Sequence, residues 1–392
     1  MFQAFFNGLS GMLSFSKNLD TVSNNISNMN TPGFRAADTF YDSLSGSNGD
    51  GGIGTQISGL GYRFTSGDIK QTGNATDVAL NGQGFFTVIQ DGNQYFTRAG
   101  QFSFNSEGVL IDKNSGGSVA SIGDTGALSE FNISDRKVLA PTATKTVDLS
   151  GNLSTGASSH EISGVKVFNR LGEEVELTLK FTKSTTVTGE WTVDVSKSSD
   201  TSTTISTSKI KFGADGTPEA AQASFSVSIG DSMNGDAAVS FSLGSPTNFS
   251  QSTSMDTGET STLKATVKDG SAVASLTSVE FLSDGTLSLK YSNGETKEGP
   301  ALAIANVKDL ASLTQVKGNL FEAQSNSGVT FEKAGNSGMG AVAGKSIELS
   351  NVDLSREFAD MLVIQRGYQA SSRLLNVSNQ LLEQLYENTR GR

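Results

Sequence analysis

Both ends of the chain carry an apolar stripe at heptad spacing, and this feature constrains the fold more than any other. Near the N-terminus, positions alternate by three and four residues, and the apolar ones are Phe2, Phe5, Leu9, Met12, Leu19 and Ile26, with Phe6 and Leu13 beside them. Such spacing places side chains along one face of an α-helix. The chain is therefore expected to begin with an amphipathic helix that ends before Pro32.

The C-terminal end repeats the pattern. Its apolar positions are Met361, Ile364, Tyr368, Leu375, Leu382 and Leu385, with Leu374 and Leu381 on the flank. Asp353 is expected to cap this second helix, and Gly367 either marks a close approach or is simply tolerated. An amphipathic helix is only marginally stable alone in water. The two helices are therefore expected to pair as an α-helical coiled coil.

Two interpretations of the paired ends remain open. In one, the two helices only cap a β domain of the same chain. In the other, they also pack against helices of other copies. The apolar stripe of each helix, here called its seam, is long. The residues between the two helices are not expected to form further helices that could cover it, which favours the second interpretation.

The residues between the two helices are expected to be all-β. Asn-Gly and Asp-Gly pairs, which favour tight hairpin turns, recur at residues 81, 91, 215, 269, 284 and 293. We expect a mainly β protein with terminal α-helices and two antiparallel, barrel- or sandwich-like domains, the outer inserted in the inner. The expected parts are terminal helices at 1–30 and 352–392, a connector at 31–70, an inner domain at 71–145 and 273–351, and an outer domain at 146–272. Gly46–Gly54 is expected to be flexible or irregular.

Composition excludes several classes of function. The formal net charge is −11, which argues against a nucleic-acid-binding surface. With no Cys and only His160, the chain has little material for a catalytic triad, a metal site or a cofactor site, and none is expected. No apolar run reaches the ~18 residues of a membrane span. Residues 1–13 lack the basic start of a cleaved signal, so we expect neither membrane insertion nor a cleaved signal peptide.

Three groups of residues could suggest a catalytic or metal-binding site, but each has a simpler structural explanation. His160 lies in a Ser-rich turn and is expected to be a surface side chain. Glu173 and Glu174 are adjacent, so a strand would send them to opposite faces and spoil any acid/base pair. The 112–117 loop resembles a calcium loop, but its twelfth position is Gly123 where an EF-hand has Glu.

Three separate motifs resemble the axial proteins of bacterial flagellar rods and hooks. The first comprises Asn24, Asn25, Asn28, Thr31, Pro32, Gly33 and Phe34. The C-terminal motif comprises Asn351, Asp353, Glu357, Gln365, Arg366, Tyr368 and Gln369. A third block, 79–86 and 95–102, resembles the β segment of the same family. The length and the inserted β domain resemble the hook members more than the shorter distal rod members.

The resemblance implies a structural role outside the cell. Hook proteins form a curved tubular homopolymer that joins rod to filament and transmits motor torque as a universal joint. Terminal helices line its channel, and subunits pass through the flagellar type III export apparatus uncleaved. Implied partners are other copies of the chain, the distal rod protein, the hook cap and the hook–filament junction proteins.

Other classes of protein share some of these sequence features. A distal rod protein or another flagellar axial protein has similar ends. A β-rich adhesin would not need paired heptads, and a carbohydrate-active enzyme would need a carboxylate pair in a cleft. Trp191 is the only Trp, so there is no stacked aromatic platform for sugars. The Asn-rich run 24–31 either caps a helix or forms a hinge to the β body, and both can hold.

Overall fold

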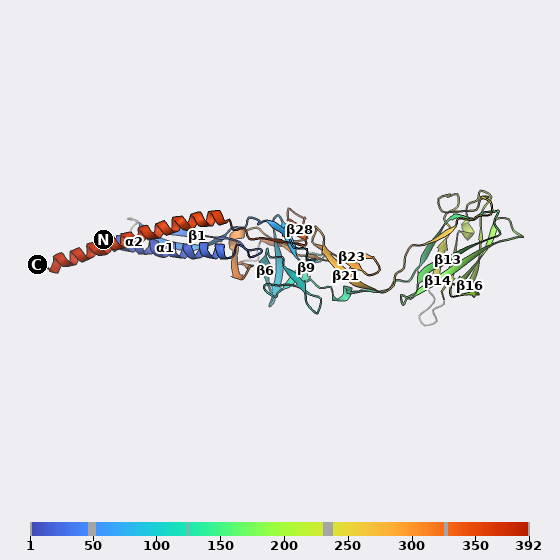
Figure 1. Cartoon of the computed structure of the whole chain (residues 1–392), viewed down its shortest axis with the longest axis horizontal. Coiled ribbons are helices and arrows are strands. Elements are labelled where there is room, and N and C mark those ends of the chain that lie inside the picture. The colour runs from blue at the N-terminus through green and yellow to red at the C-terminus, as the bar shows by residue number, and fades with distance from the viewer. Residues whose placement is uncertain (1, 46–51, 124, 230–237, 325–327, 391–392) are drawn as a thin grey trace. The chain divides into compact units, whose positions relative to one another are not determined.

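The structure is a computed structural model that describes residues 2–45, 52–123, 125–229, 238–324 and 328–390. It confirms the expected class, a mainly β chain with a helix at each end (Figure 1). Helix α1 spans Phe2–Ser27 and so ends before Pro32, as predicted. Helix α2 spans Leu354–Arg390. The Asp353 carboxylate accepts hydrogen bonds from the Ser355 (2.8 Å) and Arg356 (3.3 Å) amides, which confirms the predicted N-cap.

The two helices lie side by side and run antiparallel (Figure 1). Gly11 faces Ser371, and Phe15, further along α1, faces Gly367, earlier in α2. The start of α1 therefore lies beside the later part of α2, which extends beyond it (Figure 1), while the motif-bearing residues near 30 and 350 lie together at the other end of the helix pair.

The segment expected to be a connector contains a long β-hairpin. Strands β1 (Ala37–Ser45) and β2 (Gly52–Tyr62) are antiparallel, and β2 packs along α1. Residues 46–51 of the predicted irregular Gly-rich stretch lie outside the described residues. Residues 52–54 belong to β2 but are irregular, as predicted: the register shifts where Leu44 and Ser45 pair with Gly54 and Gly52, and Gly54 has a φ of +128°. Polar contacts fix this hairpin to α1, including those of Asn25 with Ala37 and of Ser14 with Thr55.

The chain divides into two compact units. The first comprises Met1–Asp135, Ser278–Lys290 and Thr296–Arg392, and the second Arg136–Thr277 and Tyr291–Glu295. Beyond the helices and the hairpin, the strands that lie wholly or largely in the first unit are β3 (Ile69–Gln71), β4 (Val78–Asn81), β5 (Phe85–Gln90), β6 (Asn93–Thr97), β7 (Phe102–Phe104), β8 (Leu110–Asp112), β9 (Ser118–Ile122), β10 (Leu128–Glu130), β22 (Thr286–Tyr291), β23 (Thr296–Leu302), β24 (Ile304–Val307), β25 (Leu313–Lys317), β26 (Leu320–Ala323), β27 (Val329–Glu332), β28 (Ala341–Gly344) and β29 (Ser346–Glu348).

Antiparallel pairs bring the early and late parts of the first unit together. Strand β29 pairs with β3, β28 with β4, and β24 with β5. Its aromatic core includes Phe64, which makes edge-to-face contacts with Phe85 at 5.6 Å and Phe321 at 5.5 Å between ring centroids. The short helix η3 (Leu310–Ser312) follows β24, and η1 (Ser134–Arg136) follows β10.

The second unit has a core of its own. Its elements are β11 (Val138–Leu139), β12 (Thr146–Asn152), β13 (Ser159–Phe168), β14 (Glu174–Lys183), β15 (Glu190–Lys197), β16 (Asp200–Lys211), η2 (Ala220–Gln222), β17 (Ser224–Ser228), β18 (Ala238–Ser242), β19 (Ser252–Thr253) and β20 (Lys264–Val267), while β21 (Ala274–Phe281) runs from this unit into the first. Strands β13 to β16 form an antiparallel meander. Strand β12 pairs in parallel with β18 and β19, which the expectation of purely antiparallel domains did not include.

Candidate functional site

Small residues let the two terminal helices approach closely. A Cβ at Gly11 would lie 2.9 Å from Ser371 Oγ, and one at Gly367 would lie 2.5 Å from Phe15 Cζ. Both distances are tighter than ordinary van der Waals contact. Of the two explanations given for Gly367, the structure supports close approach: the Phe15 ring occupies the space where a side chain would be.

The structure separates the predicted seam residues into two groups. Ile364 is buried and eight others are half-buried: Phe5, Leu9, Met12, Leu19, Ile26, Met361, Leu375 and Leu382. Six remain exposed in the single chain: Phe6 (54%), Leu13 (59%), Tyr368 (42%), Leu374 (42%), Leu381 (44%) and Leu385 (51%). Phe2 begins α1, but its side chain lies outside the described residues. The helix pair therefore leaves much of its apolar surface in water.

The line of closest contact along α1 lies one residue before the predicted seam. Gly8, Gly11 and Phe15 contact α2 along this line. Asn18, Val22 and Asn25 continue the same three-and-four spacing; Val22 and Asn25 are buried, and Asn18 accepts a hydrogen bond from Thr39 of β1. Ser16 and Ser23, the two polar positions in the predicted three-and-four spacing of α1, are exposed. On α2, Ile364 of the predicted line and Ser378, which shares its spacing, are both 4% exposed, whereas Tyr368 of the same line is 42% exposed. Exposed Val363 and Val377 on α2 were not singled out from the sequence.

Polar residues of both predicted motifs meet at the base of the helix pair. Asn25 is fully buried, and its Nδ2 donates to the Ala37 carbonyl (2.9 Å) and to Glu357 Oε2 (3.0 Å). Glu357 also pairs with Arg63, which reaches Asp38 at 3.2 Å. One carboxylate on α2 thus holds α1 and the end of the hairpin together.

Asn351 fixes the chain just before α2. Its Oδ1 accepts from the Ala36 amide at 2.8 Å, and its Nδ2 donates to the Arg63 (2.6 Å) and Thr65 (3.0 Å) carbonyls. Because α1 leads into Ala36 and α2 begins just after Asn351, this one amide side chain joins the two helix bases.

The turn after α1 is equally constrained. Asn28 accepts from Thr31 and donates to Asn24, and the Pro32 carbonyl accepts from Asn319 Nδ2. Gly33 has φ of +71°, and a Cβ there would collide with the Ala99 backbone. Phe34 is buried, whereas Gln365, Arg366 and Gln369 of the C-terminal motif are exposed.

A buried ion cluster, which sequence reasoning missed, lies below this base. Glu348 is fully buried and pairs with Arg35 at 2.6 Å and Arg98 at 3.2 Å. It also accepts from the Gly67 amide at 2.8 Å. Burial lowers the pKa of Arg98 to about 10, although the Glu348 charge opposes that shift. These residues are far apart in sequence, so no local signal could have grouped them.

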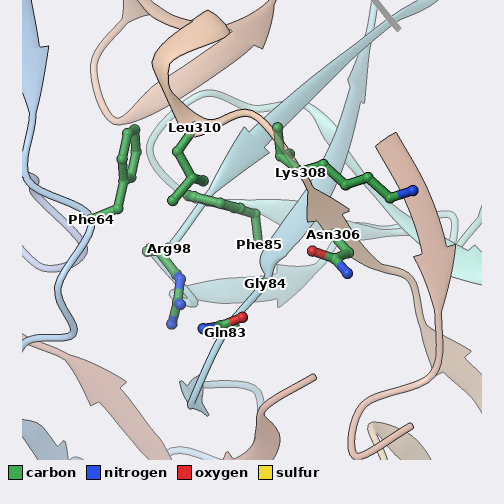
Figure 2. A pocket seen from close by; sticks show the side chains of 9 residues that line it. Phe64, Gln83, Gly84, Phe85, Arg98, Asn306, Lys308 and Leu310 are labelled. Atoms are coloured by element: carbon green, nitrogen blue, oxygen red, sulfur yellow. The ribbon is translucent and has the colours of Figure 1, made fainter. Parts of the chain in front are cut away.

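A cavity of about 410 Å³ opens beside Arg98 (Figure 2). Its described lining residues are Phe64, Gln83, Gly84, Phe85, Arg98, Asn306, Val307, Lys308 and Leu310. Two carry positive charge and none is acidic. Figure 2 shows Asn306, on β24, and Lys308, just after it, on one side of Phe85, with Phe64 on the other side.

The other residues considered as possible catalytic or metal-binding groups have hydrogen-bond or ion-pair partners within the chain. His160 is half-buried rather than fully exposed, because Nε2 lies 2.9 Å from the Leu263 carbonyl oxygen. Glu174 pairs with exposed Lys166 at 2.7 Å. The 112–117 loop closes on Asp112, which accepts from Ser115 Oγ at 2.6 Å. Within the described ranges, no three His, Asp or Glu residues gather as a metal site, and no helix is long and apolar enough to cross a membrane.

Comparisons with known families match three parts of the chain. Residues 6–35 match "Flagella basal body rod protein", residues 79–154 match "Flagellar hook protein FlgE/F/G D1 domain", and residues 343–387 match "Flagellar basal body rod FlgEFG protein C-terminal". The first and third matches cover most of both helices and, at their base, Asn25, Asn351 and Glu357. Fold and matches together define a class, the axial proteins of the bacterial flagellum.

Full-length relatives narrow the class. The flagellar hook protein FlgE of Brucella suis is 30% identical over 96% of both chains, and that of Escherichia coli is 29% identical over 97% of this chain and 99% of its own. The crystal structure of Helicobacter pylori FlgE2 shares the fold, with a TM-score of 0.50 and 13% identity over 71% of this chain and all of its own. The chain belongs to the flagellar hook protein FlgE family, and its role is that of a structural subunit of the hook.

Proposed function

We propose that the chain builds the hook tube through its terminal helices (1–30 and 352–392), which line the channel and bind neighbouring copies by their exposed apolar flanks. One observation carries this proposal: Phe6, Leu13, Leu374 and Leu381 stay 42–59% exposed on a helix pair that already buries Val22 and Ile364. Exposed apolar surface of this kind marks an interaction site. A homopolymer supplies the matching surface in every copy.

The rest of the chain has supporting roles in this proposal. Residues 71–145 and 273–351 form an inner β wall, 146–272 form an outer domain, and 31–70 connect wall to helices. The motif residues from Asn24 to Phe34 and from Asn351 to Glu357 hold the helix pair on the wall, while exposed Gln365, Arg366 and Gln369 face other copies.

The tube so built joins rod to filament outside the cell and transmits torque as a bending joint. Its proposed partners beyond its own copies are the distal rod protein, the hook cap and the hook–filament junction proteins. Delivery is by the flagellar type III export apparatus without signal cleavage. The function is mechanical, and we propose no catalysis, cofactor, nucleic acid or membrane insertion.

Substitution Leu381→Asp tests the helix contacts. Burying the exposed part of one Leu contributes about 1 kcal/mol per subunit, and an unpaired carboxylate in a packed apolar layer is strongly unfavourable. The variant should fold as a monomer with unchanged circular dichroism but fail to form tubes by electron microscopy. The matched control is Asn376→Asp, which lies on α2 about 140° around the helix and should assemble. Tubes from Leu381→Asp at the control's rate would refute the proposal.

A further inference from the structure

The cavity beside Arg98 concentrates positive charge on an acidic molecule. The chain has a formal net charge of −11, yet the nine described residues that line this cavity include Arg98 and Lys308 and no acid. A cavity lined by one sign of charge focuses the electrostatic field and attracts groups of the opposite sign. The ligand chemistry it favours is therefore anionic.

The positive charge of Arg98 is only partly compensated. Glu348 is one carboxylate shared by two guanidinium groups, those of Arg35 and Arg98. The Arg98 Nη atoms donate to Glu348 and to the Leu80 (3.1 Å) and Gly82 (2.6 Å) carbonyls, and its buried Nε has no hydrogen-bond partner among the described residues. Charges inside the protein are screened little by salt. The two guanidinium groups and the one carboxylate therefore leave a net charge of about +1 at the Arg98 side of the cavity.

Lys308 supplies the charge that a ligand can touch. It is exposed, follows strand β24, and forms no ion pair with any acid in the part of the chain that the structure describes. Figure 2 shows its side chain and that of Asn306 at the same edge of the cavity. A carboxylate at this edge would meet an ammonium group and an amide.

The opposite wall is mainly apolar. Phe64 packs edge-to-face on Phe85 at 5.6 Å between ring centroids, and the Arg98 guanidinium lies 5.4 Å from the Phe85 ring centroid. Leu310, at the start of η3, completes this wall. The cavity thus suits a group with a short apolar stem and a carboxylate end, which is the shape of an Asp or Glu side chain.

We propose that this cavity binds an Asp or Glu side chain of a second copy of the chain and so forms a contact between β bodies in the hook. A second copy is the favoured occupant because its surface is acidic and because the polymer holds copies permanently side by side. Such a contact adds a polar docking point to the apolar helix contacts, and it rests on the tube assembly proposed above.

Charge reversal at Lys308 tests the contact. The purified Lys308→Glu variant should need about a tenfold higher protein concentration to form tubes, as expected for like charges at an interface. Lys308→Gln should show an intermediate effect. The matched control, Lys290→Glu, makes the same charge change on β22 outside the cavity and should change that concentration less than twofold. Equal concentrations for Lys308→Glu and Lys290→Glu would overturn the proposal, even if tubes form normally.

A cross-linking experiment identifies the occupant. Leu310 is replaced by p-benzoylphenylalanine, tubes are grown from equal amounts of ¹⁴N- and ¹⁵N-labelled protein, and light-induced cross-links are mapped by mass spectrometry. Mixed-isotope cross-links to an Asp- or Glu-bearing segment are expected. Tubes that give only single-isotope cross-links, or none, would overturn the proposal while leaving the helix contacts intact. Phosphate binding to the monomer without such cross-links would instead make the cavity a small-anion site and would equally overturn it.

Discussion

At the residue scale, Glu348 should be the most sensitive charged position in the first unit. Glu348→Gln keeps the shape of the side chain but leaves Arg35 and Arg98 buried without their counter-charge. Removing one member of a buried ion pair costs about 3–5 kcal/mol. We expect a loss of that size in the free energy of unfolding, measured by urea denaturation followed by circular dichroism.

The control for this prediction is Glu322→Gln, an exposed side chain on strand β26, which should change stability by less than about 0.5 kcal/mol. If both variants unfold at the same urea concentration, the ion cluster does not stabilise the unit.

This cluster also marks a limit of sequence reasoning. Arg35 and Glu348 are 313 residues apart, and tertiary contacts such as the backbone hydrogen bond from the Gly33 amide to the Glu348 carbonyl (2.8 Å) bring them together. Asp353, by contrast, was predicted as an N-cap from the local sequence, and Asn25 was singled out by the motif resemblance.

At the element scale, periodicity predicted both helices but not the line along which they touch. On α1, apolar side chains cover a wide face, and heptad counting selected its most apolar line. The actual contact line holds Gly8 and Gly11, because small residues let the helix axes approach.

The β1–β2 hairpin was not predicted, because the Gly-rich residues 46–54 indicated an irregular segment. What stabilises the hairpin is packing on α1, which local sequence does not reveal.

The register of the helix pair is open to a direct test, since the chain has no Cys of its own. A Cβ at Gly11 would lie 3.8 Å from Ser371 Cβ, which is about the mean Cβ separation across a disulfide. The double variant Gly11→Cys/Ser371→Cys should therefore form an intramolecular disulfide in dilute monomer, detected by non-reducing electrophoresis. Gly11→Cys/Ser378→Cys is displaced by about 10 Å along α2 and should not. Preferential cross-linking of the second pair would show that the register is wrong.

At the scale of the whole molecule, the second unit is independent of the core of the first. Its hydrophobic cluster draws all its buried members from residues 147–263, including Trp191, Phe181 and Phe241. The clusters built on Phe85 and Ala120 use residues outside that range. The sequence predicted an insertion from its change in composition. The parallel pairing of β12 with β18 was not predictable, because it depends on contacts between segments about 90 residues apart.

Removing the insertion should therefore leave a chain that folds and assembles. Thr142 and Ser271 exchange two backbone hydrogen bonds, 3.0 and 2.8 Å long, so a short Gly/Ser turn can replace residues 143–270 while keeping that bridge and the β11–β21 pair. The shortened chain should keep the urea midpoint of the first unit, because no residue of its clusters is lost. It should still form tubes, since the exposed flanks of α1 and α2 are untouched, but their curvature should differ from wild type in electron micrographs. Failure to assemble with the first unit still folded would mean that the second unit holds the tube together. Unchanged curvature would mean that it has no part in shaping it.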